Sequence, residues 1–202
     1  YRALIPIPGV HSAILGIDDE ENNARIGLNA AWFVTPTIKV YGQVLSNSSQ
    51  VNLDGFQIGG LWSGIFDRFD IQAEYNQSSN SATRDPGNLQ SAYHFNQPLG
   101  HVLGRDFSEV VGIISYYHNR IFGRLKSVYV NSDFEEELSS NSISMDILNT
   151  DIQLGYIFNP SCNFQLYAGY TYRSEKVEIN GSTNGFWYLG IRTSLFNIYR
   201  DF

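Results

Sequence analysis

Apolar and polar residues alternate with a period of two over much of the chain, whereas the period of an amphipathic helix is hard to find. The run Phe69-Asp70-Ile71-Gln72-Ala73-Glu74-Tyr75-Asn76 alternates strictly, and residues 163–173 do the same. Successive side chains of a strand point to opposite faces of its sheet, so the pattern predicts strands with one apolar face. We expect nine strands, at residues 24–35, 37–46, 55–65, 68–77, 107–117, 120–131, 149–158, 163–173 and 185–196.

The predicted strands are long, at about 10–12 residues each, compared with roughly 5–6 for a typical strand and roughly 9–11 for a tilted membrane-spanning one. Short connections alternate with long ones along the chain, and the longest are 78–106 and 132–148. Outer-membrane β-barrels have short periplasmic turns and long extracellular loops. The pattern therefore favours an all-β fold, an antiparallel transmembrane β-barrel, with an all-β soluble domain as the alternative.

Charged and aromatic residues occupy different positions in the predicted strands. Charges lie on the polar face, as a barrel requires, because a charge at the bilayer midplane costs about 2–4 kcal/mol. They are Arg25, Lys39, Arg68, Asp70, Glu74, Arg120, Arg124, Lys126, Asp151, Arg173 and Arg192. Aromatic residues of the apolar face fall near predicted strand ends, where Trp and Tyr form the interfacial girdles of a barrel. They are Trp32, Trp62, Trp187, Tyr75, Tyr116, Tyr129, Tyr156 and Tyr172.

Nine strands are an incomplete set, because bacterial single-chain barrels have even numbers and an open edge cannot face lipid. Residues 3–15 could supply a tenth strand, but Pro6 and Pro8 cannot donate to a ladder. We expect instead the C-terminal half of a larger barrel, the rest lying upstream of Tyr1. Residues 1–23 then form an extracellular loop or partial strand, and 24–202 form the barrel segment.

The end of the chain predicts an orientation. An alternating strand followed by the terminal Phe202 is common in proteins of the Gram-negative outer membrane and predicts a periplasmic C-terminus. Segments 47–54, 78–106, 132–148 and 174–184 are then extracellular, the side on which long loops belong.

Composition narrows the classes of function. The formal charge of −7 argues against a nucleic-acid partner, and the single cysteine, Cys162, excludes an internal disulfide framework. A metal site built from His94, His101 and Asp106 has no recognised ligand spacing. A catalytic set could be assembled from Ser108, His101 and Asp106, but the sequence has no nucleophile elbow around that serine. We therefore expect that the protein is not an enzyme, and we expect no cofactor and no metal site.

Three stretches resemble proteins of one family. They are Tyr41-Gly42-Gln43, Ile71-Gln72-Ala73-Glu74-Tyr75-Asn76 and the run 93–109, which reads YHFNQPLGHVLGRDFSE. Together they resemble Bacteroidota outer-membrane proteins of the capsule-assembly Wzi-like and gliding-motility RemB family. The resemblance covers residues 24–202 and implies a barrel of about eighteen strands that serves capsular polysaccharide attachment or surface motility. This chain has Val102 and Arg105-Asp106 where the family has other residues, which leaves the branch open.

The 78–106 connection carries the candidate glycan-binding residues. Aromatic rings and planar amides suit the apolar patches and hydroxyls of a sugar. The candidates are Tyr93, His94, Asn96, Gln97, His101 and Arg105. The alternative is a loop folded into the barrel mouth whose polar groups bind other loops.

The polar strand face is predicted to be basic, with Arg25, Lys39, Arg68, Arg120, Arg124, Lys126, Arg173 and Arg192 against four acids. Such a lumen could attract anions, or its cations could pair with acids, for example Arg124 or Lys126 with Glu109 and Asp151.

From these observations and the family resemblance we expect a non-enzymatic outer-membrane barrel that organises surface polysaccharide or the motility surface. The alternatives are an anion-passing porin and a structural subunit of a larger complex. The expected partners are lipid, lipopolysaccharide, surface polysaccharide and other outer-membrane proteins.

Overall fold

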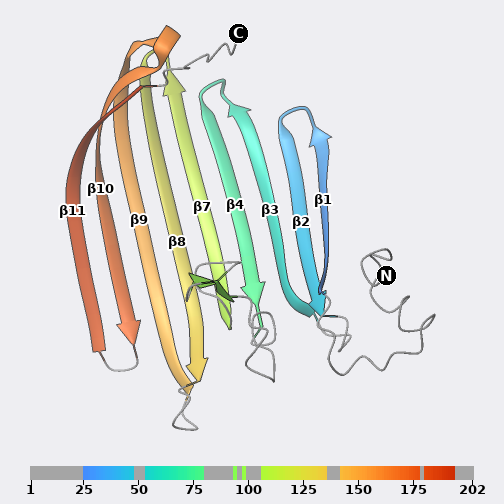
Figure 1. Ribbon diagram of the computed structural model, residues 1–202. Helices are drawn as coiled ribbons and strands as arrows, with labels where there is room; N and C mark the ends of the chain where they lie inside the picture. Colours follow the sequence, from blue (N-terminus) through green and yellow to red (C-terminus); the bar gives the residue numbers. More distant parts are fainter. Residues whose placement is uncertain are drawn as a thin grey trace, which may run out of the picture.

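The computed structural model describes residues 25–47, 53–79, 93–94, 97–98, 106–135, 142–177 and 180–193. Nine strands of these residues form one antiparallel sheet in the order β1-β2-β3-β4-β7-β8-β9-β10-β11 (Figure 1). Their bounds are β1 (Arg25–Thr35), β2 (Ile38–Asn47), β3 (Leu53–Ile65), β4 (Phe69–Ser78), β7 (Phe107–His118), β8 (Ile121–Glu135), β9 (Ser142–Asn159), β10 (Phe164–Val177) and β11 (Asn180–Arg192). The predicted nine-stranded antiparallel sheet is confirmed.

The sheet is open in the described part of the chain, with β1 at one edge and β11 at the other. Each strand pairs with the strands before and after it, and the ribbons form a single curved layer (Figure 1). A small hairpin, β5 (Tyr93–His94) with β6 (Gln97–Pro98), lies in the connection between β4 and β7. The strands are therefore consecutive antiparallel neighbours in a single meander.

Two predicted connections were too long. Strands β8 and β9 continue to the pair Glu135↔Ser142, so most of the predicted loop 132–148 is strand. Strands β10 and β11 continue to Val177↔Asn180, which leaves only residues 178–179 of the predicted connection 174–184. Antiparallel backbone pairing needs no apolar alternation on one fixed face, so the sequence pattern lost these strands where their residues became polar or their apolar residues changed face. The strict alternation of short and long connections therefore ends at the last connection.

Register brings the apolar positions of all strands to one face. One cross-strand row on that face runs Trp62, Ile71, Ile114, Leu125, Ile152, Tyr170 and Trp187. All of these side chains except the partly buried Tyr170 are exposed in the structure, and on the same face Trp32 and Trp187 are 68% and 80% exposed. Trp187 lies in the middle of β11 and not near a strand end as predicted, because that strand begins at Asn180.

The core of the described residues is small and lies on the opposite, polar face. Phe107, Val130 and Ile147 are buried there, with Val128 and Met145 packed against them. Phe107 begins β7 directly after the long connection, and Val130 and Ile147 belong to the neighbouring strand ends. The cluster therefore lies at the long-connection end of the polar face.

Candidate functional site: the polar face of the sheet

Three carboxylates of the polar face, Glu74, Asp151 and Glu109, accept hydrogen bonds from neutral donors. Glu74 of β4 accepts hydrogen bonds from the Tyr41 hydroxyl and from the Gln57 amide, whose nitrogen lies 3.2 Å from Oε2. Gln72 donates to the Tyr41 hydroxyl oxygen at 3.0 Å and so braces the same group. Residues from β2, β3 and β4 thus fix one carboxylate without a cation.

Asp151 of β9 is fixed in the same way from the other side of the sheet. Thr171 Oγ1 of β10 donates to Asp151 Oδ2 at 2.7 Å, and the Tyr188 hydroxyl of β11 donates to the same oxygen at 2.9 Å. The pairing of Arg124 or Lys126 with Asp151, one of the two options weighed from the sequence, is absent among the described residues. The Asn76 amide donates to Glu109 at 2.7 Å. Charge–charge pairing across the strands was the wrong expectation for Asp151, because hydroxyl donors occupy its oxygens.

Aromatic rings of the polar face cover glycines of the facing strand. Tyr41 lies over Gly59, and a Cβ at that glycine would be 2.5 Å from the ring. Further direct cross-strand pairs of this kind are Phe122 with Gly155, Tyr188 with Gly169 and Tyr167 with Gly190. The missing side chain lets each ring lie flat on the sheet, which is why these strand positions are glycine.

The basic face predicted from the sequence is only partly present. Lys39, Arg124, Lys126, Arg173 and Arg192 are on the polar face, but Arg68 and Arg120 lie in turns, and the side chain of Arg25 is outside the described residues. Extension of β10 adds Glu175, which pairs with Arg173 at 3.0 Å. The described polar face therefore carries five basic residues and five acidic ones, Asp70, Glu74, Glu109, Asp151 and Glu175, and has no net charge.

The cations differ in their surroundings. Lys39 Nζ lies 5.7 Å from the ring centroids of both Phe33 and Tyr41, and Arg192 Cζ lies 5.1 Å from that of Tyr167. Arg124 and Lys126 are exposed and line a cavity of about 260 Å³. Positive charge is thus available at one place on the polar face, on β8.

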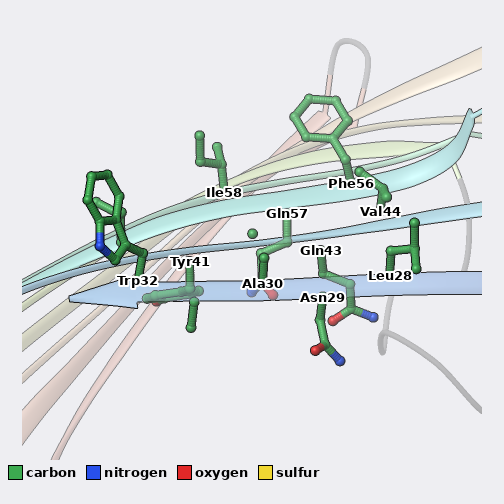
Figure 2. A pocket seen from close by; sticks show the side chains of 13 residues that line it. Leu28, Asn29, Ala30, Trp32, Tyr41, Gln43, Val44, Phe56, Gln57 and Ile58 are labelled. Atoms are coloured by element: carbon green, nitrogen blue, oxygen red, sulfur yellow. The ribbon is translucent and has the colours of Figure 1, made fainter. Parts of the chain in front are cut away.

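A second, larger hollow of about 770 Å³ lies on the apolar face of β1, β2 and β3. Figure 2 shows Trp32, Val44 and Phe56 on one side of these strands, and Asn29 on the other. Ala30 and Gly42, which pair across β1 and β2, leave the space between the larger side chains. Most of the surface that lines the hollow is hydrocarbon, and Asn29, Tyr41, Gln43 and Gln57 also border it.

The apolar side chains on one face of the sheet, which include the row from Trp62 to Trp187, form a band that we call the apolar belt. On the side of the long connections this belt ends in a row of polar residues. Register aligns Gln77, Ser108, Asn131, Asp146 and Lys176 across five strands. Tyr75 and Tyr129, two residues inside this row on the same face, donate their hydroxyl hydrogens to Gln77 at 3.2 Å and to Asp146 at 2.9 Å. Outside the belt, the hydrogen bond from Asn131 and then that from Tyr129 lower the pKa of Asp146 below its ordinary value.

The candidate glycan-binding residues lie mainly outside the described part. The backbone of Tyr93, His94 and Gln97 forms the β5–β6 hairpin, while Asn96, His101 and Arg105 are among the residues that the structure does not describe. Sequence reasoning missed Asn149 and Thr171, which join Arg124 and Lys126 at one cavity. These four residues come together only because of how the strands pair. The alternation of apolar and polar residues shows which face a side chain lies on, but not which residue of the next strand lies opposite it.

Comparison with known proteins gave no relatives: no family model matches the chain, and neither a curated protein nor a solved structure is similar to it. No helix of the described residues is long and apolar enough to cross a membrane. The described residues also contain no group of three or more His, Cys, Asp or Glu side chains placed to hold a metal ion.

Proposed function

We propose that this chain is part of the wall of an outer-membrane β-barrel, with the apolar face toward lipid and the polar face toward the interior. The observation that carries the proposal is the apolar belt, which crosses the sheet from β1 to β11 without a charged side chain. Its hydroxyl pair, Ser127 and Thr150, is mutually hydrogen-bonded at 3.1 Å. A polar group in hydrocarbon must have such a partner.

The height of the belt fits a bilayer. In β9 the apolar positions run from Leu148 to Phe158, between Asp146 and the turn at Pro160. At about 3.3 Å per residue this segment is about 33 Å long. A strand tilt of about 40° reduces that to a height of about 25 Å, the height of the lipid-facing band of outer-membrane barrels. The Tyr75 and Tyr129 hydroxyls at the margin match an interfacial girdle.

The strand count supports half of a larger barrel. Nine consecutive antiparallel strands give β1 and β11 the same direction, so joining these two edges would create a parallel pair. An all-antiparallel barrel needs an odd number of further strands between them. Nine further strands give eighteen, an even number of the kind that bacterial barrels use.

The role we propose is non-enzymatic: attachment or assembly of surface polysaccharide, or organisation of a gliding surface. The resemblance carried by residues 93–109 supports this role. The polar face is less suited to a pore for anions, because its described charges balance and Phe107, Val130 and Ile147 form an apolar cluster at one end of it. Open porins have a polar, water-filled interior.

Tryptophan fluorescence tests the lipid contact directly. The three tryptophans of the chain, Trp32, Trp62 and Trp187, all lie on the apolar face and are more than half exposed. In vesicles of brominated phosphatidylcholine we expect strong quenching of their emission, and little quenching by acrylamide added to the water. The opposite pattern would contradict the proposal, as would a protein that stays monodisperse without detergent.

A further inference from the structure

The cavity between β8, β9 and β10 contains two cations that have no ion-pair partner among the described residues. Arg124 and Lys126 are two positions apart on β8, so their side chains project from the same face. Both are exposed, and Val128, Asn149, Asp151 and Thr171 complete the lining. A pair of cations at one cavity is a site for an oxyanion, because each can donate a charge-assisted hydrogen bond.

Register explains why these charges remain available. Lys126 pairs with Asp151 and Arg124 pairs with Gln153, so one acid lies directly beside the two cations. The donors to Asp151, Thr171 and Tyr188, come from β10 and β11, on the side of β9 away from β8. The carboxylate is therefore held toward those strands, and the two cations face the cavity.

The remaining lining groups suit hydroxyls. Asn149 is exposed beside the cations and offers both an amide donor and an amide acceptor. Asp151 and Thr171 add acceptor capacity at the same cavity. We propose that the cavity binds an acidic sugar unit, with its carboxylate on Arg124 and Lys126 and its hydroxyls on Asn149 and Asp151. This inference rests on the proposed function, because the polar face must line an accessible interior.

Calorimetric titration of the complete protein in detergent micelles tests the site with three probes: glucuronate, glucose and inorganic phosphate. Glucuronate should bind at least about 10-fold more tightly than glucose, since a hydrogen bond to a charged group is worth roughly 1.5–3 kcal/mol. Lys126→Gln and Arg124→Gln should each weaken glucuronate binding by about 10-fold. Raising the sodium chloride concentration should also weaken it in the unmodified protein.

The matched control is Lys39→Gln, which removes a cation of the same face whose ammonium lies over two rings of β1 and β2. It should leave glucuronate affinity unchanged. Asn149→Ala separates a sugar from a bare oxyanion, because it should weaken glucuronate binding and leave phosphate binding unaltered.

Three results would overturn the site. Equal affinity for glucose and glucuronate, equal loss in Lys39→Gln and Lys126→Gln, or no effect of Asn149→Ala on glucuronate each contradicts it. The results distinguish failure of the proposed site from failure of the proposed barrel. If brominated lipid quenches the tryptophans but glucuronate does not bind, only the site is contradicted. Glucuronate binding without that quenching overturns the barrel.

Discussion

Ala30 and Ala31 are neighbours in the middle of β1 that project to opposite faces of the sheet, and both are exposed. Ala30 pairs with Gly42 on the apolar face, where the two small residues leave the hollow of Figure 2. Ala31 pairs with Tyr41 on the polar face. The substitutions Ala30→Arg and Ala31→Arg therefore introduce the same side chain in place of the same residue, one position apart.

The expected difference follows from what each face contacts. An arginine on the lipid side near the midplane costs about 2–4 kcal/mol, whereas one on the interior side has access to water. Ala30→Arg should lower the free energy of unfolding by about 3 kcal/mol, which is roughly a hundredfold in the equilibrium constant. Ala31→Arg should change it by less than about 0.5 kcal/mol, as surface substitutions usually do.

Urea unfolding of the complete protein in phosphatidylcholine vesicles, followed by tryptophan emission, measures both values by linear extrapolation. On a sheet whose two faces meet water, both substitutions would be nearly neutral. Equal effects of the two variants, or a larger effect of Ala31→Arg, would refute the assignment of the apolar face to lipid.

Two further predictions concern the sheet itself. Gly169→Ala should lower the free energy of unfolding by about 1–3 kcal/mol, because the added methyl group would overlap the Tyr188 ring that covers this glycine. Gly112→Ala is the control, since nothing lies within 4 Å of a Cβ there, and an equal loss in both variants in urea unfolding would contradict the ring-on-glycine explanation. Phe66→Asn should raise the free energy of unfolding by about 1 kcal/mol, because Phe66 has φ 51° in an exposed turn and asparagine tolerates this conformation better. Unchanged or lowered stability of Phe66→Asn in the same assay would show that the turn carries no strain.

The strand positions could be read from the sequence because one face of each strand is apolar. Residues 69–76 alternate without exception, and the observed β4 differs from the prediction by one residue at each end. The outer parts of β8 and β9 could not be found in this way, because their apolar residues, Met145 among them, lie on the face that is polar in the rest of the sheet, so the pattern is reversed there. Arg68 and Arg120 were assigned to the polar face because the predicted strands begin one residue too early, and both residues lie in turns in the structure.

The candidate site was less accessible to sequence reasoning, since it depends on register. The sequence identified Arg124, Lys126 and Asp151 as neighbours on one face, and register does pair Lys126 with Asp151. It did not reveal the hydroxyl donors Thr171 and Tyr188, which reach the carboxylate from one and two strands away. The strand pairing determines which donor reaches an acidic side chain, and the alternation of residues in the sequence does not reveal that pairing.

The choice of neutral donors determines what the polar face can bind. A carboxylate that accepts hydrogen bonds from tyrosine and threonine hydroxyls is held in place without a cation as its partner. Had Asp151 paired with Lys126, Arg124 alone would remain at the cavity without an acidic partner among the described residues. Because Thr171 and Tyr188 hold Asp151, the face as described is neutral in sum and still keeps positive charge concentrated at β8. A wall with no net charge and one local pair of cations favours binding of an acidic ligand at that pair over general conduction of anions. The reason is that the positive potential is confined to the cavity and does not extend over the whole face.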